Sequence, residues 1–306
     1  MTIAAAAHRR LPRAAPDGTI ASVLLAFLAT AGLFYVNIMP AIVAGVHDGL
    51  GVTDQQAGWV GSANIYGAAL GALGAVFIVK RAPWRPFAIA ALTILIAIDI
   101  GSTLIADIDV LIGTRFAHGL IGGALVGIAY GVVSRTNSPD RVFGTLLAVQ
   151  FGLGGLGNML LPPLAPAYGT QALFYALAAF SVVTLLMIPF LDDYRADRIA
   201  VQAHTPAETR IRWLPLGATL IAVFLFQAGN MAPAAYIFGL GRAYGLDINF
   251  ISSAVGWATW IGIAGCLLVI ALGVEFGRWK LMALAMLLTL VGTLAFHWSG
   301  DRMVFL

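Results

Sequence analysis

Long apolar stretches alternate with short polar loops over the whole length of the chain. Nine of these stretches, each of roughly 20 residues, are long enough to cross a hydrocarbon layer of about 30 Å as a helix. The spans we predict are Thr19–Val43, Gln56–Val79, Phe87–Ala106, Val110–Val133, Val142–Ala165, Gln171–Leu191, Leu214–Leu240, Phe250–Gly273 and Leu281–Phe296. The strands of a membrane β-barrel would instead be short, with apolar and polar residues in alternation. The pattern therefore predicts an all-α polytopic membrane protein.

The composition agrees with a protein embedded in lipid. Of the 306 residues, 60% are hydrophobic and 10% are charged, whereas the surface of a soluble domain needs about a quarter of charged residues. The formal net charge is +3, but the basic residues form neither a long block nor a one-sided helix face, so we expect no nucleic-acid partner. The lone Cys266 offers no metal-ligand pair, and no nucleotide-binding loop or catalytic motif stands out. We expect no cofactor, no metal and no enzymatic activity.

The distribution of Lys and Arg over the loops predicts the orientation. With a cytoplasmic N-terminus, the tail and every second loop hold fourteen of the 17 basic residues, in agreement with the positive-inside rule. These are Arg9, Arg10, Arg13, Lys80, Arg81, Arg85, Arg135, Arg141, Arg195, Arg198, Arg210, Arg212, Arg278 and Lys280. Arg242 and Arg302 would lie outside, and Arg115 lies within a span. We predict a multi-pass protein of the inner or plasma membrane with its N-terminus in the cytoplasm.

Short sequence matches indicate that a six-helix unit is repeated. Residues of the first two spans and of the loop that follows them recur in the same order about 195 positions further along. The matched sets are Phe27, Leu28, Ala31 and Gly32 with Phe224, Leu225, Ala228 and Gly229; Gly61 and Gly67 with Gly256 and Gly262; and Trp84-Arg85 with Trp279-Lys280. We therefore predict a cytoplasmic tail (1–18), a six-helix bundle (19–191), a charged cytoplasmic linker (192–213) and the first three helices of a second bundle (214–306). On this offset, three further helices would complete the second bundle.

The fourth span carries the most specific local motif. Arg115 is followed four residues later by Gly119 and then by a glycine-rich turn at Gly122 and Gly123. This segment resembles the fourth-helix motif of the major facilitator superfamily, and the two predicted bundles with a charged central linker are similar to the topology of that family. Residues 79–85 keep the cations of another motif of the family, between its second and third helices, but lack the Asp and the Gly of that motif.

The resemblance implies a secondary active transporter that moves a small organic solute by alternating access and is driven by a proton gradient. Its partners would be the substrate, protons and the lipid bilayer, and it would act as a monomer. The alternative is a non-transporting membrane sensor or scaffold that retains the fold, and the missing Asp of residues 79–85 gives it mild support. The sequence leaves open the identity of the substrate and the direction of transport.

Two charged residues lie within spans at matched positions. Asp99 is eight residues before Asp107 and Arg115 is eight residues after it, so two antiparallel helices joined near Asp107 bring both charges to the same depth. Burial disfavours a charged carboxylate and a neighbouring guanidinium favours it, a balance that can poise Asp99 to load and release a proton. His118 lies one helical turn from Arg115, and a histidine can change its charge near neutral pH. A static ion pair and a neutral core histidine are the alternatives.

Other polar side chains within the spans are candidates for a substrate cavity. They are Tyr35, Asn37, Asn64, Tyr66, Gln150, Asn158, Gln227, Asn230 and Tyr236. Asp99 also shares a helix face with Ser102 and Thr103, which indicates that this face lines water. For each of these candidates the alternative is a hydrogen bond that only holds two helices together.

Two sets of glycines at intervals of four residues mark surfaces where helices pack. One set is Gly119, Gly123, Gly127 and Gly131, and the other is Gly67 and Gly71. Helices surrounded by lipid gain little from the hydrophobic effect, and small residues let their backbones approach closely instead. We predict that these glycines bring neighbouring spans into contact.

Overall fold

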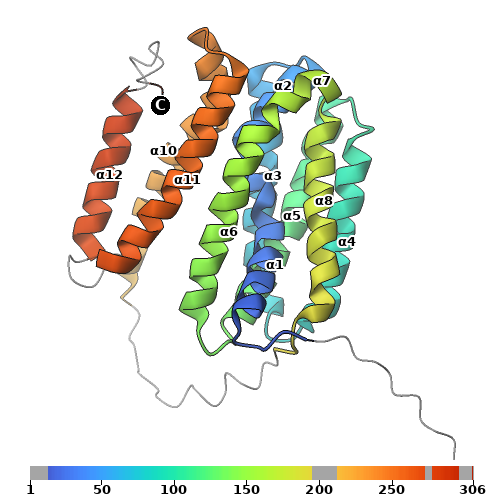
Figure 1. Cartoon of the computed structure of the whole chain (residues 1–306), viewed down its shortest axis with the longest axis vertical. Helices are drawn as coiled ribbons and strands as arrows, with labels where there is room; N and C mark the ends of the chain where they lie inside the picture. Colours follow the sequence, from blue (N-terminus) through green and yellow to red (C-terminus); the bar gives the residue numbers. More distant parts are fainter. Residues whose placement is uncertain (1–12, 195–211, 273–277, 296–304, 306) are drawn as a thin grey trace, which may run out of the picture.

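The computed structural model describes residues 13–194, 212–272, 278–295 and 305, and every element within these residues is a helix. In chain order the elements are α1 (Thr19–Asn37), α2 (Met39–Leu50), α3 (Asp54–Ile78), α4 (Trp84–Ser102), α5 (Ile108–Val133), α6 (Pro139–Leu160), the short 3₁₀ helix η1 (Pro162–Leu164), α7 (Ala165–Tyr168), α8 (Gln171–Met187), the 3₁₀ helix η2 (Ile188–Phe190), α10 (Trp213–Ala243), α11 (Ile248–Leu272) and α12 (Arg278–Ala295) (Figure 1).

The predicted class, an all-α polytopic membrane protein, is confirmed. Among the described residues, eight helical segments are long and apolar enough to cross a bilayer, and α12 adds a shorter apolar helix. The fifth span reaches Tyr168, slightly beyond the predicted end at Ala165. Within it, α6 ends at Leu160 and η1 and α7 follow, because Pro162 lacks the N–H group that would continue α6. Most of the predicted linker, residues 195–211, lies outside the described residues, so the division into two repeated bundles stays a prediction.

The prediction of one unbroken helix over Thr19–Val43 is wrong. The chain leaves helical geometry at Ile38, where φ is −110° and ψ is 17°, and this residue separates α1 from α2. Pro40 accounts for the break, because proline cannot donate a backbone hydrogen bond and its ring interferes with the preceding turn of a helix. The first turn of a new helix tolerates proline, and Pro40 lies in the first turn of α2.

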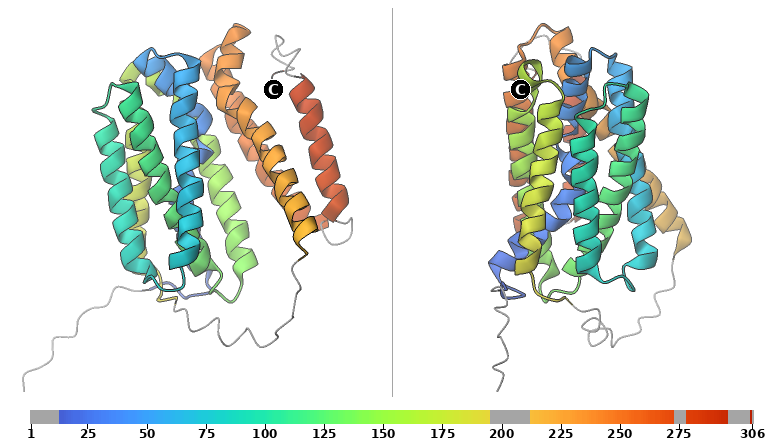
Figure 2. Two further views of the ribbon diagram at one scale, coloured as in Figure 1. Left: turned by 180° about the vertical axis from the view of Figure 1, so that it is seen from behind. Right: turned by 90° about the vertical axis from the view of Figure 1, so that its right-hand side faces the viewer.

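Six long helices, α1, α3, α4, α5, α6 and α8, lie side by side around a shared apolar interior (Figure 1, Figure 2). α1 packs against α5 and α6, α4 packs against α5 and α8, and α3 packs against α5. The interior contains one apolar cluster that includes Leu92 and Leu125 and a second that includes Ile42 and Leu173. Large apolar side chains also cover the outer surface of these helices, as expected of helices that face lipid.

Glycines bring α3 and α5 into backbone contact. The glycines that face the backbone of the other helix are Gly67 and Gly71 on α3 and Gly119 and Gly123 on α5. A Cβ atom on Gly71, for example, would collide with the carbonyl oxygen of Leu120. Gly127 and Gly131, further along α5, face side chains of α3 instead. This close approach gives the two helices dense van der Waals contact, which replaces the hydrophobic drive that lipid does not provide.

The helices α10, α11 and α12 lie on one side of the six helices, next to α6 (Figure 1). α11 packs along α6, where the Trp260 Nε1–H donates to the carbonyl oxygen of Gly152 (3.0 Å). α10 contacts α2 and α3 near its C-terminal end, where Phe238 is buried. At its other end, Trp213 and Leu214 are 74% and 86% exposed. α10 is therefore held mainly at the end of the molecule that contains α2.

Candidate functional site

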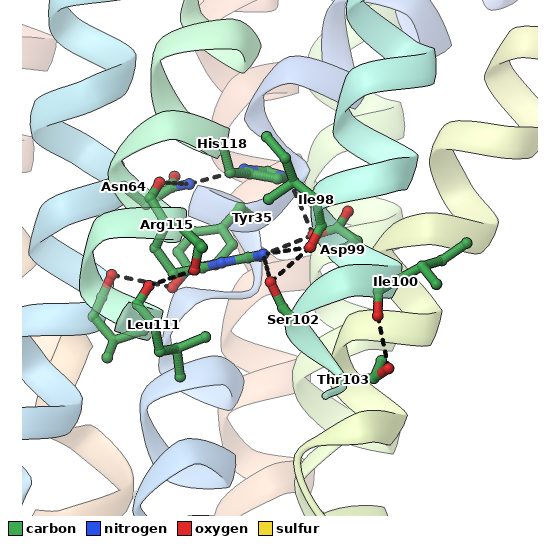
Figure 3. A network of polar contacts seen from close by, with 12 residues as sticks. Tyr35, Asn64, Ile98, Asp99, Ile100, Ser102, Thr103, Leu111, Arg115 and His118 are labelled. Atoms are coloured by element: carbon green, nitrogen blue, oxygen red, sulfur yellow. Dashed lines mark hydrogen bonds and ion pairs between the residues drawn. The ribbon is translucent and has the colours of Figure 1, made fainter. Parts of the chain in front are cut away.

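The charged residues Asp99 and Arg115 form a buried ion pair between α4 and α5 (Figure 3). Arg115 Nη1 donates to Asp99 Oδ1 at 2.8 Å, and both side chains are fully buried. Arg115 Nη2 donates to the hydroxyl of Ser102 and to the carbonyl oxygen of Ile98 (3.4 Å). The guanidinium also lies 4.8 Å from the ring centroid of Phe174 on α8, within the range of a cation–π contact. A permanent charge at membrane depth is thus paired and hydrogen-bonded, which lowers the cost of burying it.

The turn between α4 and α5 sets this pairing. Asp107 caps the start of α5, because its Oδ1 accepts hydrogen bonds from the backbone N–H groups of Asp109 (2.9 Å) and Val110 (3.0 Å). Such a cap satisfies donors that the first turn of a helix otherwise leaves free. The two helices run antiparallel from this turn, which places Asp99 and Arg115 opposite each other.

His118 joins the ion pair through its Nε2, which lies 3.4 Å from Asp99 Oδ1. Its other ring nitrogen, Nδ1, is 2.9 Å from Asn64 Nδ2 on α3. Asn64 Nδ2 also donates to the carbonyl oxygen of Arg115 (3.1 Å), so this atom is a donor and His118 Nδ1 must be the acceptor. The proton of a neutral His118 is then on Nε2, directed at Asp99. Asn64 therefore determines which nitrogen of His118 carries the proton.

Tyr35 of α1 lies against the same cluster (Figure 3). Its ring centroid is 5.7 Å from that of His118 and 5.9 Å from the guanidinium carbon of Arg115. Its hydroxyl donates to the carbonyl oxygen of Val60 (3.3 Å), which fixes the ring between α1 and α3. Tyr35 and Asn64, both predicted as cavity residues, thus lie beside the buried charges.

One oxygen of the Asp99 carboxylate has no hydrogen-bond partner in the described part of the chain. Asp99 Oδ2 and Arg115 Nε are buried, and neither has a hydrogen-bond partner among the residues that the structure describes. A proton on Oδ2 would leave the hydrogen bond from Arg115 to Oδ1 in place while removing the negative charge that neutralises Arg115. Asp99 thus presents one buried carboxylate oxygen that is available to a further hydrogen-bond donor.

The predicted water-lining face of α4 is not formed. Asp99 and Ser102 are 0% and 1% exposed and face Arg115. Thr103 lies outside this cluster, where its hydroxyl donates to the carbonyl oxygen of Ile100 (2.7 Å) (Figure 3). The prediction is wrong because α5 and α8 pack against α4 and enclose its polar face.

A second set of polar side chains, which we call the α1–α6 amide set, comprises Asn37, Gln150 and Asn158. Asn158 Nδ2 donates to the backbone carbonyl oxygen of Asn37 (3.1 Å). Three buried side-chain atoms, Asn37 Nδ2, Gln150 Nε2 and Asn158 Oδ1, have no hydrogen-bond partner within the described part of the chain. Buried polar atoms normally have partners. Within the described residues, the set therefore leaves two donors and one acceptor without a partner. The atoms of Asn37 and Asn158 are close together, and Gln150 lies eight residues, about 12 Å, before Asn158 along α6.

The remaining cavity candidates lie apart from these two sets. Tyr66 and Tyr236 are 62% and 42% exposed. On α10, Gln227 is exposed and Asn230 is half-buried. The hydroxyl of Tyr236 lies against Gly58 of α3, where a Cβ atom would collide with it. Tyr236 is therefore a contact between α10 and α3.

Two contacts were not predicted from the sequence: the ring of Phe174 beside Arg115, and an ion pair between α2 and α10. Phe174 supplies the ring beside the guanidinium, and nothing in the sequence distinguishes it from a phenylalanine of the core. At the end of the molecule that contains α2, Asp48 Oδ2 and Arg242 Nη2 form an ion pair (2.7 Å) that joins α2 to α10. His47 Nδ1 lies 3.4 Å from Asp54 Oδ1 nearby. The signal for this ion pair was available, because Arg242 was one of two basic residues predicted outside and Asp48 lies in another outer segment.

The helices and the buried ion pair define an integral multi-pass membrane protein with ionisable groups at membrane depth. The sequence profile of the Major Facilitator Superfamily matches residues 22–306. The chain belongs to the Major Facilitator Superfamily.

Curated relatives are similar to the chain over less than half of its length. The multidrug efflux pump Tap of Mycobacterium tuberculosis is 31% identical over 155 residues, which are 48% of this chain and 36% of that relative. Tap of Mycolicibacterium fortuitum is 30% identical over 146 residues, 46% of this chain and 35% of the relative. The riboflavin transporter RibJ of Trypanosoma brucei brucei is 34% identical over 135 residues, 40% of this chain and 24% of the relative. The chain thus matches about a third or less of the length of these relatives.

Proposed function

We propose that the protein is a secondary transporter that moves a small organic solute by alternating access and couples this movement to protons at Asp99, Arg115 and His118. The buried charge cluster carries the proposal, because ionisable groups within a membrane are costly and mark ion or substrate pathways. Membership of the Major Facilitator Superfamily and the similarity to named transporters support it. The N-terminus lies in the cytoplasm, in keeping with the positive-inside rule, so that α2 faces the outside.

The contacts of α10 support alternating access. At the outer end, Arg242 is paired with Asp48, and Tyr236 lies against Gly58. At the inner end, Trp213 is 74% exposed. This arrangement corresponds to a state that is closed on the outside. An ion pair that is partly exposed costs little to break, so the outer contacts can separate when the helices move.

Proton binding at Asp99 provides the coupling step. A proton taken from water binds to Oδ2, the carboxylate becomes a neutral acid, and Arg115 keeps its charge without a counter-ion. An unpaired arginine at the centre of a bilayer costs about 3 kcal/mol or more. The protonated cluster therefore favours a conformation in which Arg115 meets water or a substrate anion, and release of the proton restores the ion pair. By linkage, substrate binding and proton binding change each other's affinity by the same factor.

The α1–α6 amide set is the proposed substrate site on the side of the six helices. Its free atoms are two N–H donors and one carbonyl acceptor, which suit a neutral molecule that carries both carbonyl and N–H groups. A flavin carries both carbonyl and N–H groups, and RibJ is a riboflavin transporter, while Tap is a multidrug efflux pump. We infer an aromatic, hydrogen-bonding solute and take riboflavin as the first probe. Gln227 and Asn230 of α10 are proposed contacts from the opposite side.

Riboflavin flux in liposomes that contain the purified protein tests the function. We expect flux that depends on an imposed proton gradient and falls when a protonophore collapses it. Asp99→Asn removes the proton acceptor, so any remaining flux should be insensitive to the gradient. Because this variant also leaves Arg115 unpaired, His118→Gln is the second variant, which keeps the ion pair and should shift the pH dependence of flux. Flux that ignores the gradient in the unaltered protein would remove the coupling, and binding of riboflavin without flux would favour a sensor.

Variants of single amides test the substrate site. Gln150→Ala should raise the KM for riboflavin about fivefold, the loss expected for one hydrogen bond. Gln171 is an exposed amide at the outer end, outside the α1–α6 amide set, so Gln171→Ala is the control and should leave the KM unchanged. Gln227→Ala tests the contact from α10 in the same assay. An equal KM in Gln150→Ala and the unaltered protein would contradict the proposed site.

Labelling of single cysteines tests the orientation. In a Cys266→Ala background, Gln171→Cys at the outer end and Arg141→Cys at the inner end provide two exposed positions. In intact cells a membrane-impermeant maleimide should label Gln171→Cys at once and Arg141→Cys only after the membrane is permeabilised. The reverse order would place the N-terminus outside.

A further inference from the structure

A cavity of about 440 Å³ lies at the inner end of the six helices, where α3 ends and α4 begins. Four basic side chains, Lys80, Arg81, Arg85 and Arg135, line it together with one carboxylate, Asp193. None of the residues of the buried charge cluster or of the α1–α6 amide set lines this cavity. It is therefore a separate, positively charged cavity, which we call the basic cavity.

Among the described residues, Asp193 is the single carboxylate of the basic cavity, and it is already paired. Asp193 Oδ1 lies 3.2 Å from Arg85 Nε, and Asp193 Oδ2 lies 3.4 Å from Arg13 Nη1. The other three cations of the cavity have no carboxylate partner within residues 13–194, 212–272 and 278–295. Residues 79–85 also contain no acidic side chain that could supply one. Counted over the described residues, the cavity therefore has a surplus of positive charge.

Arg135 is the most constrained of these three cations. Its Nη1 donates to the carbonyl oxygen of Tyr194 and its Nη2 donates to that of Val79, each at 3.0 Å. Burial lowers the pKa of Arg135 from its ordinary value, but a guanidinium keeps its charge in proteins. A partly buried charge that is bonded only to neutral carbonyl groups is stabilised further by an anion.

The first turn of α4 adds to the positive field of the basic cavity. Pro83 occupies the N-cap position, and no side chain accepts from the backbone N–H groups of Trp84 and Arg85. The third residue of the helix, Pro86, has no N–H group. The start of a helix carries a partial positive charge and free donors, and both favour a phosphate group. Trp84 and Pro86 of this turn also line the cavity. The partial positive charge of the helix start thus adds to the positive charge of the side chains in the basic cavity.

Exposed apolar side chains occur on the ends of α3 and α4 that flank the basic cavity. On the last turns of α3, Val76 and Phe77 are 65% and 79% exposed, and Ile89 on α4 is 44% exposed. The ends of membrane spans lie at the level of the lipid headgroups, and fatty chains fill the layer beyond them. A ligand that fits both surfaces has an anionic head and apolar chains.

We propose that the basic cavity binds the phosphate group of an anionic phospholipid, with Lys80, Arg81 and Arg135 around the phosphate and the fatty chains along α3 and α4. Phosphate accepts strong, charge-assisted hydrogen bonds from both Lys and Arg, and basic cavities at the cytoplasmic ends of membrane helices bind acidic headgroups. A soluble phosphate compound shares the chemistry of the headgroup but has no chains to cover Val76 and Phe77. The site requires only that the protein is in a membrane, and it is independent of transport.

Native mass spectrometry of the purified chain measures this binding. We expect phosphatidylglycerol to be retained in preference to phosphatidylcholine. Arg81→Gln should weaken the binding of phosphatidylglycerol about fivefold, and Arg81→Gln with Lys80→Gln about 25-fold, because each basic residue near an anionic lipid contributes roughly fivefold. Arg141→Gln is the matched control, since Arg141 is an exposed arginine at the same end that does not line the cavity, and it should leave the affinity unchanged.

A soluble headgroup separates the two sources of phosphate. Glycerol phosphate at millimolar concentration should neither bind measurably nor displace the lipid. If it binds as tightly as phosphatidylglycerol and needs Arg81, the lipid assignment is overturned. Equal retention of the two lipids, or equal losses in Arg81→Gln and Arg141→Gln, would overturn the site itself. Both arginines are exposed, so unchanged thermal unfolding of the variants in detergent confirms that the fold is kept.

Discussion

Two ion pairs of nearly equal length lie in different regions of the protein. The pair between α4 and α5, Asp99 with Arg115, is 2.8 Å long, and both side chains are 0% exposed. The pair between α2 and α10, Asp48 with Arg242, is 2.7 Å long, and its side chains are 23% and 27% exposed. Removal of one partner leaves an unpaired buried charge in the first region and a charge that water can reach in the second. The length of an ion pair therefore does not determine how much stability the protein loses when one partner is removed.

This difference suits the two regions to different tasks in the proposed transport cycle. The buried pair lies between α4 and α5, and α8 packs against α4 beside it. Water does not reach the pair, so its stability changes strongly only when one of its charges changes, for example when Asp99 binds a proton. The pair between α2 and α10 is partly exposed and can break and form again at little cost. Four variants, in order of expected effect, test how far this comparison holds.

The largest loss is expected for Asp99→Asn. This change leaves Arg115 charged and buried without a counter-ion, which costs about 3 to 5 kcal/mol of unfolding free energy. Thermal and denaturant unfolding of the purified protein in detergent measures it. The double variant Asp99→Leu with Arg115→Leu should recover most of the loss, because it removes both charges. A double variant as unstable as Asp99→Asn would show that the unpaired charge is not the cause.

The second largest loss of stability is expected for Gly71→Ala, where α3 and α5 are in backbone contact. Gly71→Ala places a methyl group against the carbonyl oxygen of Leu120, and such overpacking costs about 1 to 3 kcal/mol. Gly74, on the same helix, has open space around its Cβ position, so Gly74→Ala should be neutral or slightly stabilising because Ala favours helix. Unfolding midpoints of the two variants, measured side by side, check this. Equal midpoints would contradict the close contact of α3 with α5.

A smaller loss of stability is expected for Trp260→Phe, at the contact between α6 and α11. Trp260→Phe removes the N–H group that donates to Gly152, and the loss of one such hydrogen bond costs about 1 kcal/mol. The neighbouring Trp257 is 56% exposed, so Trp257→Phe is a control of the same chemistry and should cost less. The unfolding midpoint and the rate of limited proteolysis of α11 provide the measurement. A greater loss in the control would mean that ring packing, and not the hydrogen bond, holds α11.

The smallest loss of stability is expected for Asp48→Asn in the pair between α2 and α10. An ion pair reached by solvent contributes about 1 kcal/mol or less, and salt screens it. We expect the difference in stability from the unaltered protein to vanish in about 1 M NaCl, whereas the loss in Asp99→Asn should persist there. If high salt also restored the stability of Asp99→Asn, solvent would screen both ion pairs alike, against the difference in their exposure.

The sequence by itself determined how the chain is divided between lipid and water. Stretches of about 20 apolar residues predict membrane helices, and the structure has helices at these places with ends that differ by a few residues, except that the first is broken at Ile38. Equal distances from Asp107 indicated that Asp99 and Arg115 share a depth, and the structure pairs them at 2.8 Å. These features follow from position along the chain, because each residue of a helix advances by a fixed rise of about 1.5 Å.

The tertiary structure alone decided which side chains meet. The contact between Asn64 and His118, the Phe174 ring beside Arg115, and the basic cavity around Arg135 and Asp193 each join segments far apart in the sequence. Depth in the membrane depends on the position of a residue in its own helix, but contact also depends on how each helix is rotated about its axis and which neighbours it packs against. Enclosure by those neighbours buried the α4 face that was predicted to line water.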